Sequence, residues 1–357
     1  MDYTKEFGFD ISRLKAFCGY YYDLASLKKS ASGGMASIIS EQFIKENGCV
    51  FGVKYSSDYK GAEYCCVTNF DGLDAIKGSK YIVTQKKVLI ENKYISVFDI
   101  LKEKLQQGQK VLFIGLGCDV AGVYSYCKTN NLCTDNLFLI DLICAGPTRP
   151  EVAKSFIEEI EKKFKSKVVD FSVRYKKYGW EPRYVRVVFQ NGKIFEKPFY
   201  ETDYGEAFNV YVNKACCKCN FKGVNHKSDL TIGDYWGGVN EQSDNYNKWG
   251  VSVAFVNTDK GKKLLGTIDK DKFYLEETDL IRALRGNTNY CYSSRIFDEK
   301  KFTTFQKNLT DKGLHYAVKH STTIFNKIKI RIKKFLKCIF PKKIISLLRI
   351  IKHKYME

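Results

Sequence analysis

The stretch KVLFIGLGCDVAGVYSYCKTN, residues 110–130, contains two successive local patterns. Its first six residues form a short apolar run that predicts a buried strand, and the rest predicts a turn that leads into a helix. NLFLIDLICAG, residues 136–146, predicts a second buried strand, and a helix is expected after Pro150. Because strands and helices alternate, we expect an α/β unit with a mostly parallel sheet.

The alternation extends toward the N-terminus. Beyond an irregular segment at 1–29, the pattern predicts a helix in 30–48, strands at 49–55, 62–70 and 78–85, and a helix at 95–108.

Downstream the pattern changes to an antiparallel meander of strands at 168–177, 184–192 and 193–201, with the Asn191-Gly192 turn between the last two. A cysteine-cluster region and one more strand and helix, in 251–268, follow. The whole is a mixed α/β (α+β) chain that ends in a basic helical C-terminal tail.

Charge is concentrated in that tail. The chain has a formal net charge of +19, and residues 319–357 contain twelve Lys and Arg side chains and one Glu. The remaining body is nearly balanced, so we expect no nucleic-acid partner. Residues 322–353 alternate basic and apolar side chains, which predicts either peripheral contact with the inner membrane or a terminal helix packed on the body. The polar start MDYTKEFGFDISRLK predicts a cytoplasmic protein.

Cys216-x-x-Cys219 has a spacing suited to a metal ion or one edge of an iron–sulfur cluster. Cys217-x-Cys219 is an alternative pair. Cys118 and Cys144 each follow a predicted strand, and ligands gather at the carboxyl ends of strands in open α/β sheets. The four thiols at 118, 144, 216 and 219 could therefore converge, although each single thiol also suits a packed core.

Two short motifs suit a phosphate group. SASGG, residues 30–34, offers hydroxyl and amide groups at a helix start, and GSKY, residues 78–81, adds a lysine beside a Gly-Ser turn. Taken alone, SASGG equally suits an N-cap with a flexible turn.

In order along the chain, seven motifs resemble those of the coenzyme F420 hydrogenase/dehydrogenase beta-subunit family, in particular its bacterial members from exopolysaccharide gene clusters. They extend from about Ser30 to Arg295: SASGG, GSKYIVTQ, VLFIGLGCDVAGVYSYC, DLICAGPTRPEV, VRYKKYGW, CCKCNFKGVNHKSDLTIGDYWG and GVSVAFVNTDKG.

The resemblance implies FAD and a 4Fe-4S cluster. It assigns the cluster thiolates to Cys118, Cys144, Cys216 and Cys219. It places the following residues near the flavin or its phosphates: Ser30, Ser32, Gly33, Gly34, Ser79, Lys80, Tyr81, Asp229, Thr231, Gly233 and Asp234. It divides the chain into an N-terminal extension (1–29), an N-terminal domain (30–108), a cluster and flavin domain (109–296) and the basic tail (297–357).

The resemblance therefore implies a flavin- and iron–sulfur-dependent oxidoreductase in surface or exopolysaccharide biosynthesis, acting on a glycan or nucleotide-sugar type of substrate. The two cysteine-rich ferredoxin runs of most bacterial relatives are missing from the sequence, so we expect a ferredoxin-like protein or a reduced cofactor to donate electrons. Leu116-Gly117 and Ala145 also depart from the family motifs. These departures suggest the alternative of a non-redox glycan-modifying transferase, or a scaffold, that keeps the fold without the cofactors.

Overall fold

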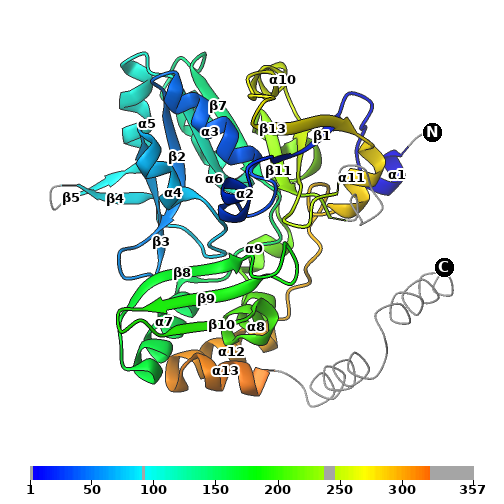
Figure 1. Cartoon of the computed structure of the whole chain (residues 1–357). Coiled ribbons are helices and arrows are strands. Elements are labelled where there is room, and N and C mark those ends of the chain that lie inside the picture. Colours follow the sequence, from blue (N-terminus) through cyan, green and yellow to red (C-terminus); the bar gives the residue numbers. More distant parts are fainter. Residues whose placement is uncertain (1–2, 91–92, 237–245, 322–357) are drawn as a thin grey trace.

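An eight-stranded sheet is the largest element of the computed structural model, which describes residues 3–90, 93–236 and 246–321 (Figure 1). Its strands are β1 (Lys15–Tyr21), β2 (Cys49–Tyr55), β3 (Ala62–Val67), β6 (Val111–Leu116), β7 (Leu137–Leu142), β11 (Leu230–Asp234), β12 (Ser252–Val256) and β13 (Phe273–Thr278).

The strand order is β13-β1-β12-β11-β7-β6-β2-β3. The four central strands β11, β7, β6 and β2 are parallel to their neighbours within this group. The outer pairings are all antiparallel. The expected α/β unit with a parallel sheet is thus confirmed, and antiparallel strands extend it on both sides.

Side chains alternate between the two faces of the sheet, so each strand contributes to two cores. On β6, Leu112 enters one core, whereas Val111 and Phe113 enter the other. The first core lies under α2 (Leu24–Lys29), α3 (Met35–Lys45), α4 (Phe70–Ile76) and α10 (Asp259–Gly266). The opposite face is covered by α5 (Val97–Gln106), α6 (Gly117–Thr129), α1 (Thr4–Phe7) and α11 (Leu280–Gly286).

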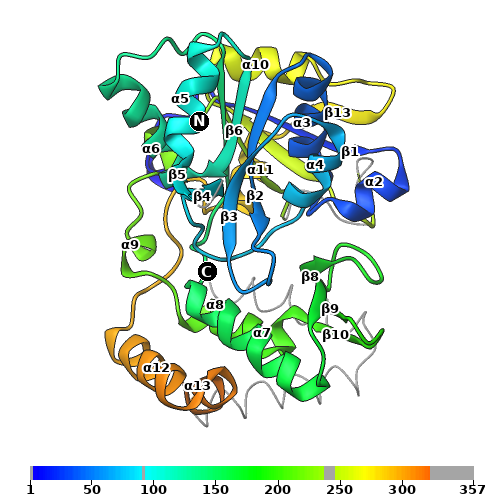
Figure 2. The same cartoon turned by 90° about the vertical axis from the view of Figure 1, so that its left-hand side faces the viewer.

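A second, smaller unit, here called the small lobe, contains the antiparallel meander (Figure 2). The strand order β10-β9-β8 and the turn at Gly192, with φ of 78°, confirm the expected meander. Its elements are α7 (Pro150–Phe164), β8 (Val168–Tyr175), β9 (Tyr184–Phe189), β10 (Ile194–Pro198), η1 (Phe199–Glu201), α8 (Asp203–Val210), α12 (Glu299–Lys312) and α13 (Leu314–Ser321).

The remaining short elements lie outside these two units. They are β4 (Lys87–Ile90) and β5 (Lys93–Ser96), which form a hairpin, α9 (Lys214–Cys217) and η2 (Gly223–Asn225).

Two local expectations were wrong. Residues 1–29 are not irregular, because they contain β1, which pairs with β12 and β13. Residues 78–85 form no strand and make only single bridges at Ile82 and Gln85. The run from Asp229 to Asp234, which no predicted element included, contains strand β11 in the centre of the sheet.

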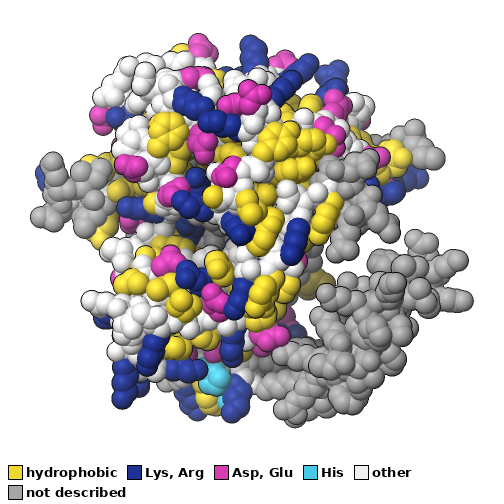
Figure 3. Space-filling view, viewed as in Figure 1, with side chains coloured by type: hydrophobic (Ala, Val, Ile, Leu, Met, Phe, Trp, Pro, Cys, Tyr) yellow, Lys and Arg dark blue, Asp and Glu magenta, His cyan; other side chains and the backbone are white. Residues whose placement is uncertain are grey.

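The predicted basic tail starts inside the small lobe. Phe305 of α12 and Leu314 of α13 are fully buried in its core. The segment 322–353, for which membrane contact was expected, lies outside the described residues. Within the described part of the chain, no helix has the length and apolar character needed to cross a membrane. On the face shown in Figure 3, basic and acidic side chains are intermingled over both units.

Candidate functional site

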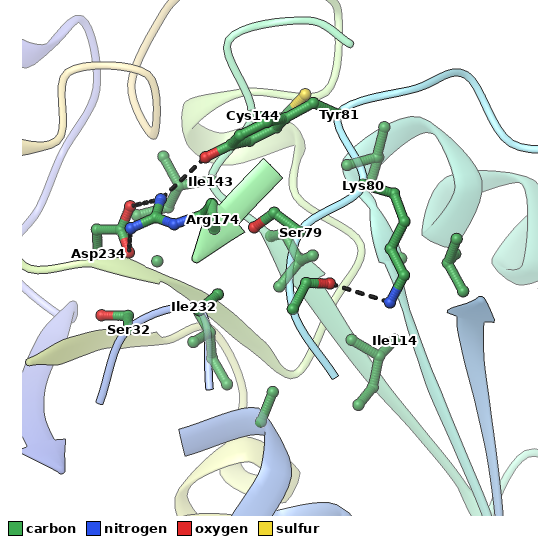
Figure 4. Close-up of a pocket in the computed structure, with 18 of the residues that line it drawn as sticks. Ser32, Ser79, Lys80, Tyr81, Ile114, Ile143, Cys144, Arg174, Ile232 and Asp234 are labelled. Carbon is green, nitrogen blue, oxygen red and sulfur yellow. Dashed lines mark hydrogen bonds and ion pairs between the residues drawn. The ribbon is translucent and has the colours of Figure 1, made fainter. Parts of the chain in front are cut away.

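A cavity of about 450 Å³ lies between the small lobe and the carboxyl ends of the central parallel strands (Figure 4). The strand ends contribute Ile114–Leu116 of β6, Leu142–Gly146 at and after β7, and Ile232–Asp234 of β11. The small lobe contributes Arg174, Arg183, Tyr200 and Phe208. This is the position at which open α/β sheets bind ligands.

The SASGG motif forms the turn before α3, and its shape depends on both glycines. A Cβ on Gly33 would lie 2.0 Å from the carbonyl oxygen of Gly19, and Gly34 has a left-handed φ of 97°. The hydroxyl of Ser252 accepts hydrogen bonds from the backbone N–H groups of Gly34 and Met35, at 3.1 and 3.4 Å. Ser30, Ser32 and Gly34 line the cavity; Gly33 does not.

The GSKY motif lines the cavity through Ser79, Lys80 and Tyr81. The ammonium of the buried Lys80 donates to the carbonyl oxygens of Ala75, Lys77 and Gly78, at 3.3, 2.7 and 3.1 Å, around the C-terminus of α4. Lys80 therefore holds the loop against the helix end, where a cation is favourable.

Arg174 of β8 connects three parts of the cavity wall. Its guanidinium donates to both carboxylate oxygens of Asp234, at 2.6 and 3.2 Å, and to the hydroxyl of Tyr81 at 2.9 Å (Figure 4). Arg174 is almost fully buried, and its side chain is only 4% exposed. A bidentate pair of this kind fixes the small lobe against the end of β11.

Lys176 makes a second connection between the small lobe and the sheet. Its buried ammonium donates to the carbonyl oxygens of Leu27 and Ser32, at 2.7 Å each. Burial lowers the pKa of Lys176 to about 7, and the positive charge of Arg174 contributes to the lowering. Lys176, which is not part of the SASGG motif, therefore fixes the orientation of the SASGG turn.

Besides Gly33, two residues of the expected flavin set, Asp229 and Thr231, are absent from the cavity wall. Asp229 precedes β11, whereas Gly233 and Asp234 at the opposite end of the strand line the cavity. The carboxylate of Asp229 accepts from the backbone N–H of Leu139 at 2.8 Å and from the hydroxyl of Thr258 at 2.6 Å. Thr231 is fully buried and is likewise absent from the cavity wall. A flavin contact for either residue stays a prediction.

The four expected cluster thiols are brought together from three segments. Cys118 is in the first turn of α6, Cys144 follows β7, and Cys216 and Cys219 lie in and just after α9. Loss of hydration raises the pKa of Cys118 to about 12, and the charges of Asp119, Cys144 and, last, Cys219 add to this. Burial raises the pKa of Cys216 to about 11, with contributions from Cys144 and Cys219.

Cys216, and not Cys217, lies toward Cys144. A Cβ placed on Gly146, two residues after Cys144, would be 2.9 Å from the Cβ of Cys216. The thiol of Cys217 instead lies 3.9 Å from the carbonyl oxygen of Asn213, inside α9.

Two cations lie beside the thiols. The ammonium of Lys222 donates to the carbonyl oxygens of Cys144 and Asn289, and its charge opposes the effect of burial on the pKa of Cys144. Burial lowers the pKa of Arg295, and the charge of Cys144 is the largest influence in the other direction. Positive charge of this kind stabilises a set of thiolates.

Within the described residues, no three His, Cys, Asp or Glu side chains converge closely enough to hold a single metal ion. The four thiols are therefore near one another but too far apart to share one metal ion. They lie at one edge of the cavity, because Cys144 is part of the cavity wall.

Sequence reasoning missed several residues that line the cavity, and also Lys176, which supports its wall through the carbonyl oxygen of Ser32. Arg174 and Lys176 are in the motif VRYKKYGW, and Ser252 is in GVSVAFVNTDKG, so these motifs carried a signal. No sequence signal pointed to Arg183, which precedes β9, or to Tyr200, which follows β10, because both lie outside every motif.

Similarities to known proteins indicate the family of this chain. Residues 108–281 match the family model that describes the C terminus of the coenzyme F420 hydrogenase/dehydrogenase beta subunit. A relative is the F420-dependent formate dehydrogenase 1 subunit beta of Methanococcus maripaludis, 25% identical over 257 residues. The alignment covers 70% of this chain and 58% of that protein, so the chain spans little more than half of its relative.

A solved structure shares the fold. It is a chain of the F420-reducing NiFe hydrogenase complex from Methanosarcina barkeri, with a TM-score of 0.51 and 15% sequence identity. The superposition covers 83% of this chain and 92% of the other. Residues 108–281 therefore resemble the C-terminal domain of the coenzyme F420 hydrogenase/dehydrogenase beta subunit, and the formate dehydrogenase relative supports the same family.

Proposed function

We propose that this chain is a flavin- and iron–sulfur-dependent oxidoreductase that binds FAD in the cavity and a 4Fe-4S cluster on Cys118, Cys144, Cys216 and Cys219. The observation that carries the proposal is Cys144, which belongs both to the thiol group and to the wall of the cavity. A cluster on this thiol would adjoin a flavin in the cavity. A flavin exchanges electrons in pairs and a cluster exchanges them singly, so the two groups together supply conversion between these modes.

The cavity suits a flavin. Its volume of about 450 Å³ is within the usual range for cofactor sites. The N-terminus of α3, whose turn is held by Ser252 and Lys176, directs the positive end of the helix dipole toward phosphate oxygens, while the N–H groups of Gly34 and Met35 donate to Ser252. Ser32, Ser79 and Gly233 line the same space.

The thiol group suits a cluster better than a single ion. Bonds of about 2.3 Å to one zinc ion would hold four sulfurs close together, and the described residues contain no such arrangement. A cube of irons and sulfides separates its cysteine ligands more widely. Lys222 and Arg295 would offset the negative charge of the ligated cluster.

A role in surface-polysaccharide biosynthesis, with a glycan substrate and a separate electron donor, extends the proposal. The support is the likeness of the motifs to members from exopolysaccharide clusters. The hydrogenase relative is named as part of a complex, which supports a protein donor here as well.

The test is anaerobic purification of the full chain, followed by an absorption spectrum and by iron and flavin assays on the same sample. The expected result is a broad shoulder near 400 nm with about four irons and one flavin per chain. A featureless spectrum that persists after reconstitution with iron, sulfide and FAD would contradict the proposal and favour a non-redox transferase or scaffold.

A further inference from the structure

The cavity contains a second guanidinium, that of Arg183, and its charge is poorly neutralised. Its ion-pair partner among the described residues is Glu181, whose carboxylate oxygen is 3.7 Å from Nη1 and so beyond hydrogen-bond distance. The Nε atom of Arg183 is buried and has no hydrogen-bond partner in the described residues. Arg174 differs, because both of its Nη atoms are bonded to Asp234.

Aromatic rings hold Arg183 in place without a carboxylate. The guanidinium carbon lies 5.4, 5.0 and 5.8 Å from the ring centres of Phe199, Tyr200 and Trp236. Nη2 donates to the hydroxyl of Tyr200 at 2.6 Å. The cation is therefore already oriented for a planar anionic group.

Two phenol groups beside Arg183 have unused donors. The oxygen of Tyr81 accepts from Arg174 at 2.9 Å and from Arg183 at 3.5 Å, and the oxygen of Tyr200 accepts from Arg183. Each phenol carries one proton, which remains available to donate. Among the described residues no acceptor for either O–H group is present. Tyr81 also has a left-handed φ of 57°, a strained conformation that bulky residues adopt mainly at functional sites.

We propose that Arg183, Tyr81 and Tyr200 bind an anionic oxygen group of the substrate, a carboxylate or a phosphate, at the small-lobe side of the cavity. All three side chains offer donors, and an oxygen anion offers only acceptors. The inference deepens the proposed function and rests on it, because it narrows the substrate of the same cavity to an anionic glycan or a sugar phosphate. The rings of Trp236 and Phe208 line the same cavity and can pack on the face of a sugar.

A flavin phosphate would present the same chemistry, but the placement favours the substrate. Arg183 and Tyr200 belong to the small lobe. The residues proposed for the flavin phosphates, Ser32 and Ser79, belong to the loops beside the sheet.

Isothermal titration calorimetry on the full-length protein tests the inference with three sugars, glucuronate, glucose 6-phosphate and glucose. We expect both anionic sugars to bind at least about tenfold more tightly than glucose, a difference in line with charged hydrogen bonds. Arg183→Met should remove the preference, Arg183→Lys should keep part of it, and Tyr81→Phe and Tyr200→Phe should each weaken it. The matched control is Arg186→Met, since Arg186 pairs with Asp170 and Glu196 outside the cavity.

Equal affinity for the three sugars, or an unchanged preference in Arg183→Met, would overturn the inference. FAD is titrated into the same variants. FAD affinity should stay unchanged in the variants at Arg183 and Tyr200, and a parallel loss there would assign the anion site to the cofactor and overturn the substrate assignment. If Arg183→Met does not fold, Arg183→Lys and Tyr200→Phe decide by the same comparison. The sugar titrations measure binding and no turnover, so they report on the anion site alone. The iron and flavin assays report separately on the proposed function.

Discussion

The guanidinium of Arg174 and the carboxylate of Asp234 form two hydrogen bonds, of 2.6 and 3.2 Å, although the residues are sixty positions apart. One belongs to the small lobe and the other ends the central strand β11. The pair is nearly buried, with side chains 4% and 14% exposed. The two sides of the cavity are thus joined by a charge pair that water hardly reaches.

Removal of one partner of this pair should destabilise the protein strongly. Arg174→Met leaves the Asp234 carboxylate without its cation, which we expect to cost about 3–5 kcal/mol in the free energy of unfolding. The double variant Arg174→Met/Asp234→Leu should recover much of that loss, as measured by denaturant unfolding. Equal destabilisation of the single and double variants would contradict the prediction. Arg186→Met, which removes the pairs with Asp170 and Glu196, should cost less than Arg174→Met, because both of these pairs are more exposed than the pair of Arg174 and Asp234.

Stability should rise with pH because of Lys176. The folded-state pKa of Lys176 is about 7, and the unfolded value is about 10.4. Between these values the unfolded chain binds a proton that the folded chain does not, so the free energy of unfolding should gain up to about 1.4 kcal/mol per pH unit from this group. Deprotonation leaves two N–H donors for the carbonyls of Leu27 and Ser32.

Denaturant unfolding at pH 7, 8 and 9 checks this prediction. Lys176→Met should lower the slope of this pH dependence without abolishing it, because burial also lowers the pKa of Lys80 to about 7 and Lys80 contributes in the same direction. The control Lys177→Met, which removes a more exposed ammonium paired with Glu196, should leave the slope unchanged. An identical slope in wild type and Lys176→Met would show that Lys176 stays charged in the folded protein.

The cysteine register can be tested by iron content. Cys216→Ser should abolish iron binding after anaerobic reconstitution, because Cys216 is the thiol directed toward Cys144. Cys217→Ser should leave about four irons per chain, in keeping with ligation by the other thiols. Cys66→Ser, in β3, is the matched control. If Cys217→Ser is the damaging substitution, the register is wrong by one residue.

Asp229 should act on stability and not on flavin affinity. Asp229→Ala removes the acceptor for the N–H of Leu139 and for the hydroxyl of Thr258, each a hydrogen bond to a charged group. The expected loss is about 2–4 kcal/mol in unfolding free energy. FAD titration of the folded variant should give the wild-type dissociation constant. A weaker flavin affinity with unchanged stability would restore Asp229 to the cofactor site.

The sequence was informative where the signal is local. The runs at 110–115 and 136–142 are apolar without alternation, because β6 and β7 are covered on both faces, and they were recognised as buried strands. The convergence of Cys118 and Cys144 followed from the same pattern, since parallel strands end at one edge of a sheet. By contrast, β1 was missed because its partners, β12 and β13, lie more than 200 residues away along the chain.

The position of a residue within a strand decided which predicted site residues meet. Asp229 and Asp234 look equivalent in the sequence as two acids of one run. A strand rises about 3.3 Å per residue, so they are about 16 Å apart along β11. Only the end that meets the small lobe can contribute to the cavity. The aromatic rings beside Arg183, those of Tyr200 and Trp236, come from two separate segments of the chain. Their sequence spacing therefore has no periodicity from which the contact could be predicted.

The place of β1 has a consequence during synthesis. Of the eight strands of this sheet β1 is made first, yet both of its neighbours, β12 and β13, are made last. Until residue 256 has emerged, β1 has unpaired backbone on both edges, and one edge stays unpaired until residue 278. During this time its side chains Phe17, Cys18 and Tyr21 lack their core. Such a strand can pair with other chains. The nascent protein should therefore depend on chaperone protection of its first twenty residues for most of its translation.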